Sequence, residues 1–275
     1  MVKNLQHYLK KAEKEKWAIG QFNFSTLEQL KGILEAAQKL NSPVILGTSL
    51  KESQFVGLGQ AAALVKAYQK EINVPLFLNL DHAPSFSYTK KAIDLGYQAV
   101  HFDGSSLDLN ENIKIAKAVV QYARKKGVLV EGEFNKIGSD SITNPEEAKS
   151  FIEKTKVDSL AINIGTSHGL ETLVGGCRID LKGLKEIRNK IKTTHLVLHG
   201  GSGTSDKDIK AAIKLGIVKI NINAETRMAY TFALREALQR NPKEIIPYKY
   251  LPEAILSVQK KVEEKIKLFG SVNKV

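Results

Sequence analysis

The sequence has little of what secreted and membrane proteins depend on. A single cysteine, Cys177, among 275 residues excludes an internal disulfide framework. The N-terminal stretch MVKNLQHYLKKAEKEKW is charged where a signal peptide would need an uninterrupted apolar run. No apolar segment approaches the roughly 20 residues that span a bilayer. These absences predict a soluble, cytoplasmic protein without a membrane partner.

The chain also lacks a long polar tract that would separate two domains. Hydrophobic residues make up 43% of it, which is enough to bury a sizeable core, so we expect residues 1–275 to form one domain. The net charge is +12, but the lysines are interleaved with glutamates about one helical turn apart, as in KKAEKEK and KKVEEKIK. This pattern is typical of solvated helices. It predicts no nucleic-acid partner, although a basic exterior attracts anionic metabolites.

Strand-like and helix-like segments alternate along the whole chain. Amphipathic segments such as Leu27–Leu40, Glu111–Lys126, Asp206–Leu215 and Thr226–Arg240 follow short apolar runs. Eight such units in about 240 residues predict an α/β fold, a (β/α)8 TIM barrel, with a doubly wound open sheet as the alternative. A further amphipathic helix, Glu253–Phe269, is suited to packing on a barrel end or on a second subunit. The expected strands are 17–24, 43–49, 74–82, 99–105, 128–134, 159–165, 195–201 and 218–223.

Histidines stand where three of the apolar runs stop. His82, His168 and His199 each end a strand, and Glu133 ends another between the first two. Imidazole is a common neutral metal ligand, so three imidazoles and a carboxylate converging from strand ends predict a metal site. Reactive groups of a barrel project from these C-terminal strand ends. Other polar residues predicted there are Asp81, Asp103 and Asn221.

The remaining histidines and one lysine fit structural positions better. His7 lies in a leading helix and His195 begins a strand, so neither is expected in the site. His101 shares its face with Asp103 and is interpreted as a hydrogen-bonded structural histidine. Lys219 begins the eighth strand and is expected at the opposite rim, which disfavours a Schiff-base mechanism.

Glycine-rich segments provide a place for an anion. Gly169 and the run Gly200, Gly201, Ser202, Gly203 expose backbone N–H groups, and a helix begins directly afterwards. The position after the seventh strand is where barrels recurrently bind phosphate.

Six ordered motifs resemble the class II, metal-dependent fructose-bisphosphate and tagatose-bisphosphate aldolases. The resemblance covers nearly the whole chain and includes NSPVILGTS (41–49) and QFNFSTLEQL (21–30). The motifs are LDHAPS (80–85), DGS (103–105), VEGE (130–133), IGTSHG (164–169), LHGGSG (198–203) and KININ (219–223).

The resemblance implies roles for individual residues. It makes His82, His168 and His199 ligands of Zn²⁺ or another divalent metal, and Asp81 the acid/base at the hydroxyl of the aldehyde half. Glu133 and Asp103 would help to hold an alternative metal position. Gly169, Gly200 and Ser202 would also contact Na⁺ or K⁺. The predicted substrate-binding residues are Asn23, Ser49, Gly169, Gly200, Gly201, Ser202, Asn221 and Asn223.

Several positions depart from the family pattern. The segment after VEGE is short and lacks the usual catalytic Glu; Asp140 is the nearest substitute, and Ser141 stands at the expected position. Ala224 replaces a phosphate-binding Thr. Glu171-Thr172 replaces a common lysine, whose charge Arg178 would restore from the same loop.

The predicted function is therefore that of a zinc-dependent aldolase of glycolysis or related carbohydrate metabolism. It would cleave fructose or tagatose 1,6-bisphosphate reversibly to dihydroxyacetone phosphate and glyceraldehyde 3-phosphate through a metal-stabilised enediolate. The alternatives are an aldolase for another ketose phosphate and a non-catalytic barrel that binds a metal and a sugar phosphate. The terminal helix and the resemblance together suggest a homodimer or homotetramer.

Overall fold

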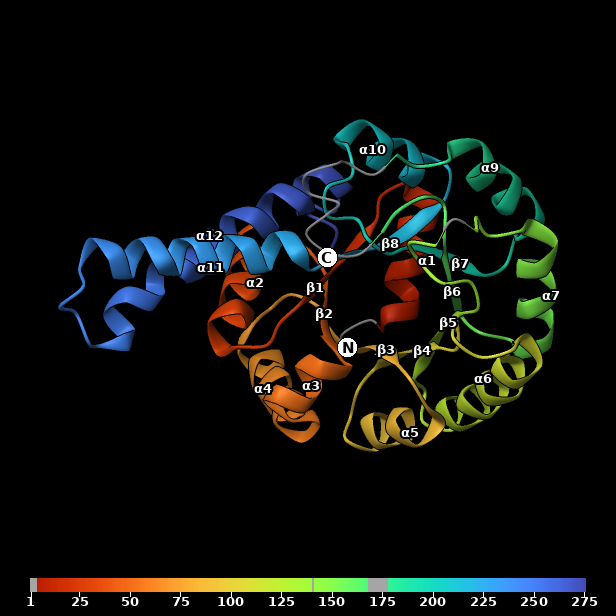
Figure 1. Cartoon of the computed structure of the whole chain (residues 1–275), viewed down its shortest axis with the longest axis horizontal. Helices are drawn as coiled ribbons and strands as arrows, with labels where there is room; N and C mark the ends of the chain where they lie inside the picture. Colours follow the sequence, from red (N-terminus) through yellow and green to blue (C-terminus); the bar gives the residue numbers. More distant parts are fainter. Residues whose placement is uncertain (1–3, 140, 168–177) are drawn as a thin grey trace.

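Eight parallel strands close into a barrel surrounded by helices, as predicted (Figure 1). The computed structural model describes residues 4–139, 141–167 and 178–275. Each strand pairs with its neighbours in the sequence, and β1 pairs with β8 to close the ring. The strands are β1 (Ile19–Asn23), β2 (Val44–Ser49), β3 (Leu76–Ala83), β4 (Ala99–Asp103), β5 (Leu129–Glu133), β6 (Ser159–Ile162), β7 (His195–Leu198) and β8 (Ile217–Ile222).

Polar N-caps begin most of the helices, because a side-chain oxygen satisfies a backbone N–H that has no partner within the helix. Thr26, Ser85, Asp108 and Ser205 each accept such a bond. The helices are α1 (Leu5–Glu15), α2 (Leu27–Lys39), α3 (Leu50–Val56), α4 (Leu58–Glu71), α5 (Phe86–Asp94), α6 (Leu109–Arg124), α7 (Pro145–Thr155), α9 (Leu181–Lys190), α10 (Asp206–Lys214), α11 (Ala224–Arg240) and α12 (Pro247–Phe269). None of these helices is long and apolar enough to cross a membrane.

The inside of the barrel changes from apolar to polar along its axis. At the N-terminal end, side chains such as Ile19, Ile45 and Phe77 pack against helix α1, which is seen through the ring of strands in Figure 1. Alternate residues of a strand point to the same face. The next inward positions are polar residues, all of them buried except the partly exposed Asp103, in i, i+2 pairs on several strands: Gln21 and Asn23, Asn79 and Asp81, His101 and Asp103, Glu131 and Glu133, Lys219 and Asn221. The site therefore rests on a polar lumen above an apolar base.

Helix α12 is not at a barrel end, which was one of the two places expected for it. It begins at Pro247 and packs outside the barrel against α2, α10 and β1, so it completes the ring of helices beside the strands and does not cover a barrel end. Its apolar stripe, which includes Val258, Val262 and Ile266, is fully buried there. Helix α11 runs out from the barrel and α12 returns beside it, which gives the projecting arm in Figure 1.

Gly32 allows α2 and α12 to approach closely. A Cβ at this position would lie 2.7 Å from the backbone oxygen of Ile255 and 2.8 Å from Val258 Cβ. We therefore expect Gly32→Ala to lower the free energy of unfolding by roughly 1–3 kcal/mol through overpacking. Chemical denaturation measures the change. Gly59→Ala is the matched control: its Cβ would meet only Leu95 at 3.9 Å, so equal losses in the two variants would contradict this account.

Candidate active site

An irregularity at the end of β3 presents two neighbouring residues to the same space. The β3–β4 register shifts between Leu80 and Ala83, and His82 adopts a left-handed backbone conformation with φ of 50°. Such a bulge turns a side chain away from the face that strict alternation would give it. The fully buried His101 supports the bulge, because its Nδ1 accepts a hydrogen bond from the His82 backbone N–H at 3.2 Å. Asp81 and His82 consequently both line the pocket.

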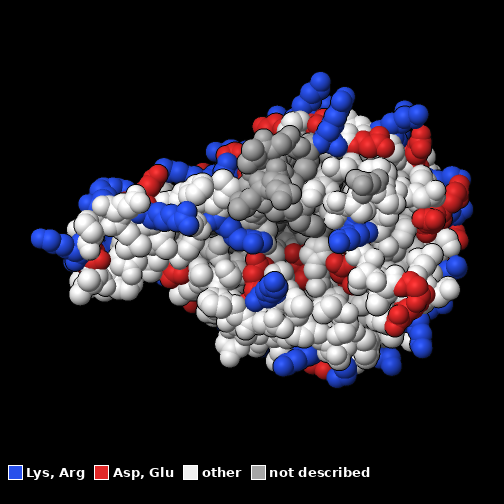
Figure 2. Space-filling model, viewed as in Figure 1, with Lys and Arg blue, Asp and Glu red and all other residues white. Residues whose placement is uncertain are grey.

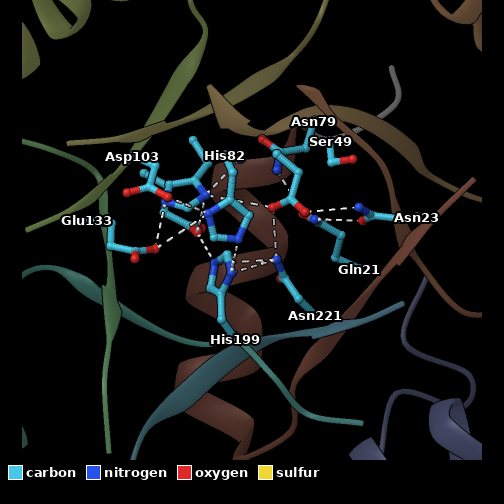
Figure 3. A network of polar contacts seen from close by, with 12 residues as sticks. Gln21, Asn23, Ser49, Asn79, His82, Asp103, Glu133, His199 and Asn221 are labelled. Carbon is cyan, nitrogen blue, oxygen red and sulfur yellow. Dashed lines mark hydrogen bonds and ion pairs between the residues drawn. The ribbon is translucent and has the colours of Figure 1, made fainter. Parts of the chain in front are cut away.

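Two imidazoles meet at the centre of the site (Figure 3). His82 Nδ1 lies 2.8 Å from Asp103 Oδ2, and His199 Nε2 lies 2.7 Å from Glu131 Oε1. A carboxylate accepts, so each of these nitrogens donates its proton, and in the neutral ring the other nitrogen carries a lone pair. His82 Nε2 and His199 Nδ1 face one another at 3.1 Å. When both rings are neutral, two imidazole nitrogens in this geometry suit a shared cation.

The separation of these nitrogens fits one divalent metal ion. Two imidazole nitrogens on a tetrahedral zinc, each at about 2.0–2.1 Å from it, stand about 3.3 Å apart. Burial lowers the pKa of His199 to about 3, so the ring stays neutral and able to act as a ligand. Burial also acts to lower the pKa of His82, but nearby carboxylates, Asp81 first among them, outweigh it and raise that pKa.

The three residues predicted to form an alternative metal position lie close together. His82, Asp103 and Glu133 offer ligand atoms within 4.8 Å of one another. Ser105 orients Asp103 by donating from both its backbone nitrogen and its hydroxyl to Oδ1. Glu133 Oε2 lies 3.3 Å from His101 Nε2. These carboxylates therefore lie beside the facing imidazoles, on the β4 and β5 side of the barrel.

Lys219 corrects one expectation. Its side chain lies in the lumen and not at the opposite rim, 4% exposed, with Nζ 2.7 Å from Glu131 Oε2. Burial acts to raise the pKa of Glu131, but Lys219 and the surrounding imidazoles outweigh it and lower that pKa. The alternation of side chains along β8 predicts this position, because Lys219 and Asn221 point to the same face of the strand. The buried pair keeps Glu131 ionised beneath His199.

Asp81 is held by two amides. Asn221 Nδ2 donates to its Oδ1 at 3.1 Å and Asn23 Nδ2 to its Oδ2 at 2.9 Å. Burial acts to raise the pKa of Asp81, but the adjacent imidazoles, led by His82, outweigh it and hold that pKa well below its usual range. Gln21 and Asn79 extend the amide chain deeper into the lumen. The Asp81 carboxylate is therefore ionised and fixed in orientation.

The other predicted site residues fall into three groups. Ser49, Gly200, Ser202 and Asn223 line the pocket with Asn23 and Asn221. Gly201 does not line the pocket: a Cβ at this position would point at Ile220. The predictions for His168, Gly169, Asp140, Glu171 and Thr172 lie outside the described residues.

Of one further wall of the pocket, only Ala224 was predicted from the sequence. One face of α11 lines the cavity of about 600 Å³, together with Lys136 and Ile137 from the loop after β5. In Figure 2, Lys and Arg side chains gather around the hollow, and Asp and Glu lie inside it. The helical spacing of the α11 residues was a readable signal; they are Ala224, Arg227, Met228, Thr231, Phe232 and Arg235.

A closed β/α barrel with imidazoles and carboxylates gathered at its C-terminal strand ends is an enzyme architecture. Residues 3–274 match the family model for fructose-bisphosphate aldolase class-II. The chain therefore belongs to the class II fructose-bisphosphate aldolase family, whose members are lyases and generally depend on a metal. This confirms the resemblance found in the motifs.

Individual relatives match along nearly their whole lengths. The chain is 39% identical to the sulfofructosephosphate aldolase of Alkalicoccus urumqiensis, over 97% of this chain and 96% of that protein. It is 36% identical to the fructose-bisphosphate aldolase of Staphylococcus aureus strain Mu50, over 98% of each. The crystal structure of the YdjI aldolase from Escherichia coli K12 superposes with a TM-score of 0.87 at 31% identity, covering 100% of this chain and 99% of that one.

The facing imidazoles make a prediction about metal content. His199→Ala removes one of the two convergent nitrogens, so we expect the purified variant to contain much less divalent metal than the unmodified protein. Elemental analysis by mass spectrometry measures the stoichiometry. His7→Ala is the control, because His7 lies on α1 at the other end of the barrel. Stoichiometric metal in the His199→Ala protein would remove this residue from the ligand set.

Proposed function

We propose that this protein is a metal-dependent aldolase that cleaves a ketose phosphate reversibly into dihydroxyacetone phosphate and an aldehyde. The observation that carries the proposal is the 3.1 Å approach of His82 Nε2 to His199 Nδ1, beside the ionised Asp81. His168, which also ends a predicted strand, would complete a set of three imidazoles. Three neutral donors of this kind suit zinc, and cobalt, manganese or iron are the alternatives.

The residues around Asp81 suit a carbon–carbon cleavage. A bound divalent ion would supply a positive charge that polarises the ketose carbonyl. Asp81 would take the proton from the hydroxyl on the carbon that becomes the aldehyde, while the electron pair of the breaking bond passes to the dihydroxyacetone phosphate half. Asn23 and Asn221 hold the carboxylate for this transfer. The proton carrier at the other carbon is assigned to Asp140, as the sequence suggests.

The basic side chains that line the pocket favour an anionic substrate. Gly200 and Ser202 line one part of it and would bind a phosphate through backbone and hydroxyl donors. Lys136, Arg227 and Arg235 line another part and would attract the anionic end of the aldehyde half. Fructose and tagatose 1,6-bisphosphates carry such groups at both ends. A sulfofructose phosphate is the second candidate, because the relative from Alkalicoccus urumqiensis is named for it.

A turnover assay with three substrates tests this function. Purified protein is given fructose 1,6-bisphosphate, tagatose 1,6-bisphosphate or sulfofructose phosphate, with and without a chelator, and the released dihydroxyacetone phosphate is measured. We expect turnover of at least one, lost on chelation and restored by added zinc. Turnover that survives complete metal removal would contradict the metal mechanism. Binding of all three without cleavage would favour the non-catalytic barrel.

Asp81 provides a second test. Asp81→Asn keeps the shape of the side chain but removes the base, and it replaces one of the two oxygens that accept from Asn23 and Asn221 by an NH2 group. We therefore expect kcat to fall at least about 10²-fold. Metal content should stay at the level of the unmodified protein. Stopped assays measure kcat, and elemental analysis measures the metal. An unchanged kcat would assign Asp81 to a structural role.

The assembly stays a proposal of a homodimer or homotetramer. Its support is the exposed apolar surface of the arm, where Ile245 is 85% exposed and Tyr248 is 76% exposed. Large apolar side chains that are exposed together on one projection often mark a protein–protein interface.

A further inference from the structure

Glu52 does not line the pocket itself, but it contacts residues of two of the pocket's walls. Its Oε2 accepts hydrogen bonds from Asn23 Nδ2 at 2.9 Å and from the Ser49 backbone N–H at 2.8 Å. Its Oε1 accepts from Asn223 Nδ2 at 3.0 Å and lies 3.9 Å from Arg227 Nε. The Glu52 side chain is only 12% exposed. One carboxylate thus contacts groups from β1, from the β2–α3 turn and from the start of α11.

A local role explains only part of this arrangement. Ser49 and Glu52 form a capping box at the N-terminus of α3, in which each side chain bonds the backbone N–H of the other. That motif requires the bond to Ser49 and nothing more. The bonds to Asn23 and Asn223 reach residues that are distant in the sequence and line the pocket. They are additional to the cap.

The bonds of Asn223 show that Glu52 does more than cap α3. It occupies the N-cap position of α11, where an Asn side chain ordinarily bonds the first N–H groups of the helix. Here it makes no capping bond; its amide nitrogen donates to Glu52 and its Oδ1 accepts from Arg227 Nε at 2.7 Å. The Glu225 N–H of the first turn bonds to Ser202 Oγ at 3.4 Å instead, and the Asn223 side chain is held toward the pocket wall.

Asn23 connects Glu52 to Asp81. It donates to Glu52 and to Asp81, and its Oδ1 accepts from Gln21. Both amide hydrogens are therefore committed to carboxylates, and the orientation of Asp81 depends in part on where Glu52 holds Asn23.

We propose that Glu52 is a positioning residue that fixes Asn223 and Arg227 on the substrate wall through Oε1, and Asp81 through Asn23 and Oε2. This inference rests on the proposed aldolase function for its kinetic consequences. The two oxygens have separable duties: Oε1 serves substrate binding and Oε2 serves the chemical step.

Two substitutions separate these duties. A Gln side chain has one acceptor oxygen, which should take the place of Oε2 with its two partners, and its NH2 group would then face the donor of Asn223. Glu52→Gln should therefore raise KM for the ketose phosphate about tenfold with kcat within threefold, as expected when one bond near a charged group is lost. Glu52→Ala loses both sides and should also lower kcat at least about tenfold. Steady-state kinetics measures both constants.

Two controls exclude a merely structural role. Asp108→Ala removes the N-cap of α6, which is exposed, and should lower Tm while leaving KM and kcat unchanged. Asn223→Ala should raise KM at least as much as Glu52→Gln does, and the double variant should be no worse than Asn223→Ala alone, because Glu52→Gln then removes a contact that is already lost. A Glu52→Gln protein with lowered Tm and unchanged KM would overturn the proposal, and so would additive effects in the double variant.

A crystal structure of the Glu52→Gln protein gives a readout that needs no turnover. We expect the Asn223 side chain to rotate and cap α11, its ordinary bonding position. An Asn223 side chain that stays beside residue 52 would overturn the proposal even if the enzyme is active. If no ketose phosphate is turned over, the proposed function fails by itself, and this rotation still decides the role of Glu52.

Discussion

The active site depends on two hydrogen bonds that set the tautomers of two imidazoles. Asp103 and Glu131 each take the proton of one ring, so that His82 and His199 present lone pairs to the same small space. His82 Nε2 and His199 Nδ1 lie 3.1 Å apart, close enough to share a proton or to bind one cation together. The site is thus arranged for a cation by its carboxylates as much as by its histidines, which is a recurrent device at metal centres.

Keeping those carboxylates ionised inside a barrel requires compensation. Glu131 is fully enclosed, and Lys219 lies against it, so the lumen contains a paired charge and not an isolated one. The amides of Asn23 and Asn221 donate to Asp81, and those of Gln21 and Asn79 continue the network below it. The apolar base over α1 closes this polar column at its lower end, and the substrate pocket opens at the other.

Much of the fold was readable from the sequence because it repeats. Apolar runs and amphipathic segments alternate eight times, and a closed barrel follows from that count. Positions at strand ends were equally readable, since parallel strands bring Asp81, Asp103 and Asn221 to one rim. The resemblance in the motifs, confirmed by the family match, added roles that spacing alone leaves open.

The features that were not predicted from the sequence have physical causes. Lys219 was assigned from its distance along the strand, whereas its parity and its long stem bring the ammonium up to Glu131. The wall formed by α11 depends on the direction in which that helix leaves the barrel, and the return of α12 beside it depends on packing at Gly32. Glu52 was hidden because a Ser-x-x-Glu pattern at a helix start is explained by capping alone. Its other contacts join segments that only the closed barrel brings together.

Helix α11 leaves the barrel as a pocket wall, and α12 comes back to complete the ring at a fixed place between α2 and α10. The closure of the barrel therefore sets where the arm starts and ends but not how long it is. Whole helical turns added to or removed from its tip would leave strand register and imidazole geometry untouched. The length of the arm is therefore the part of this architecture that the closure of the barrel leaves unconstrained.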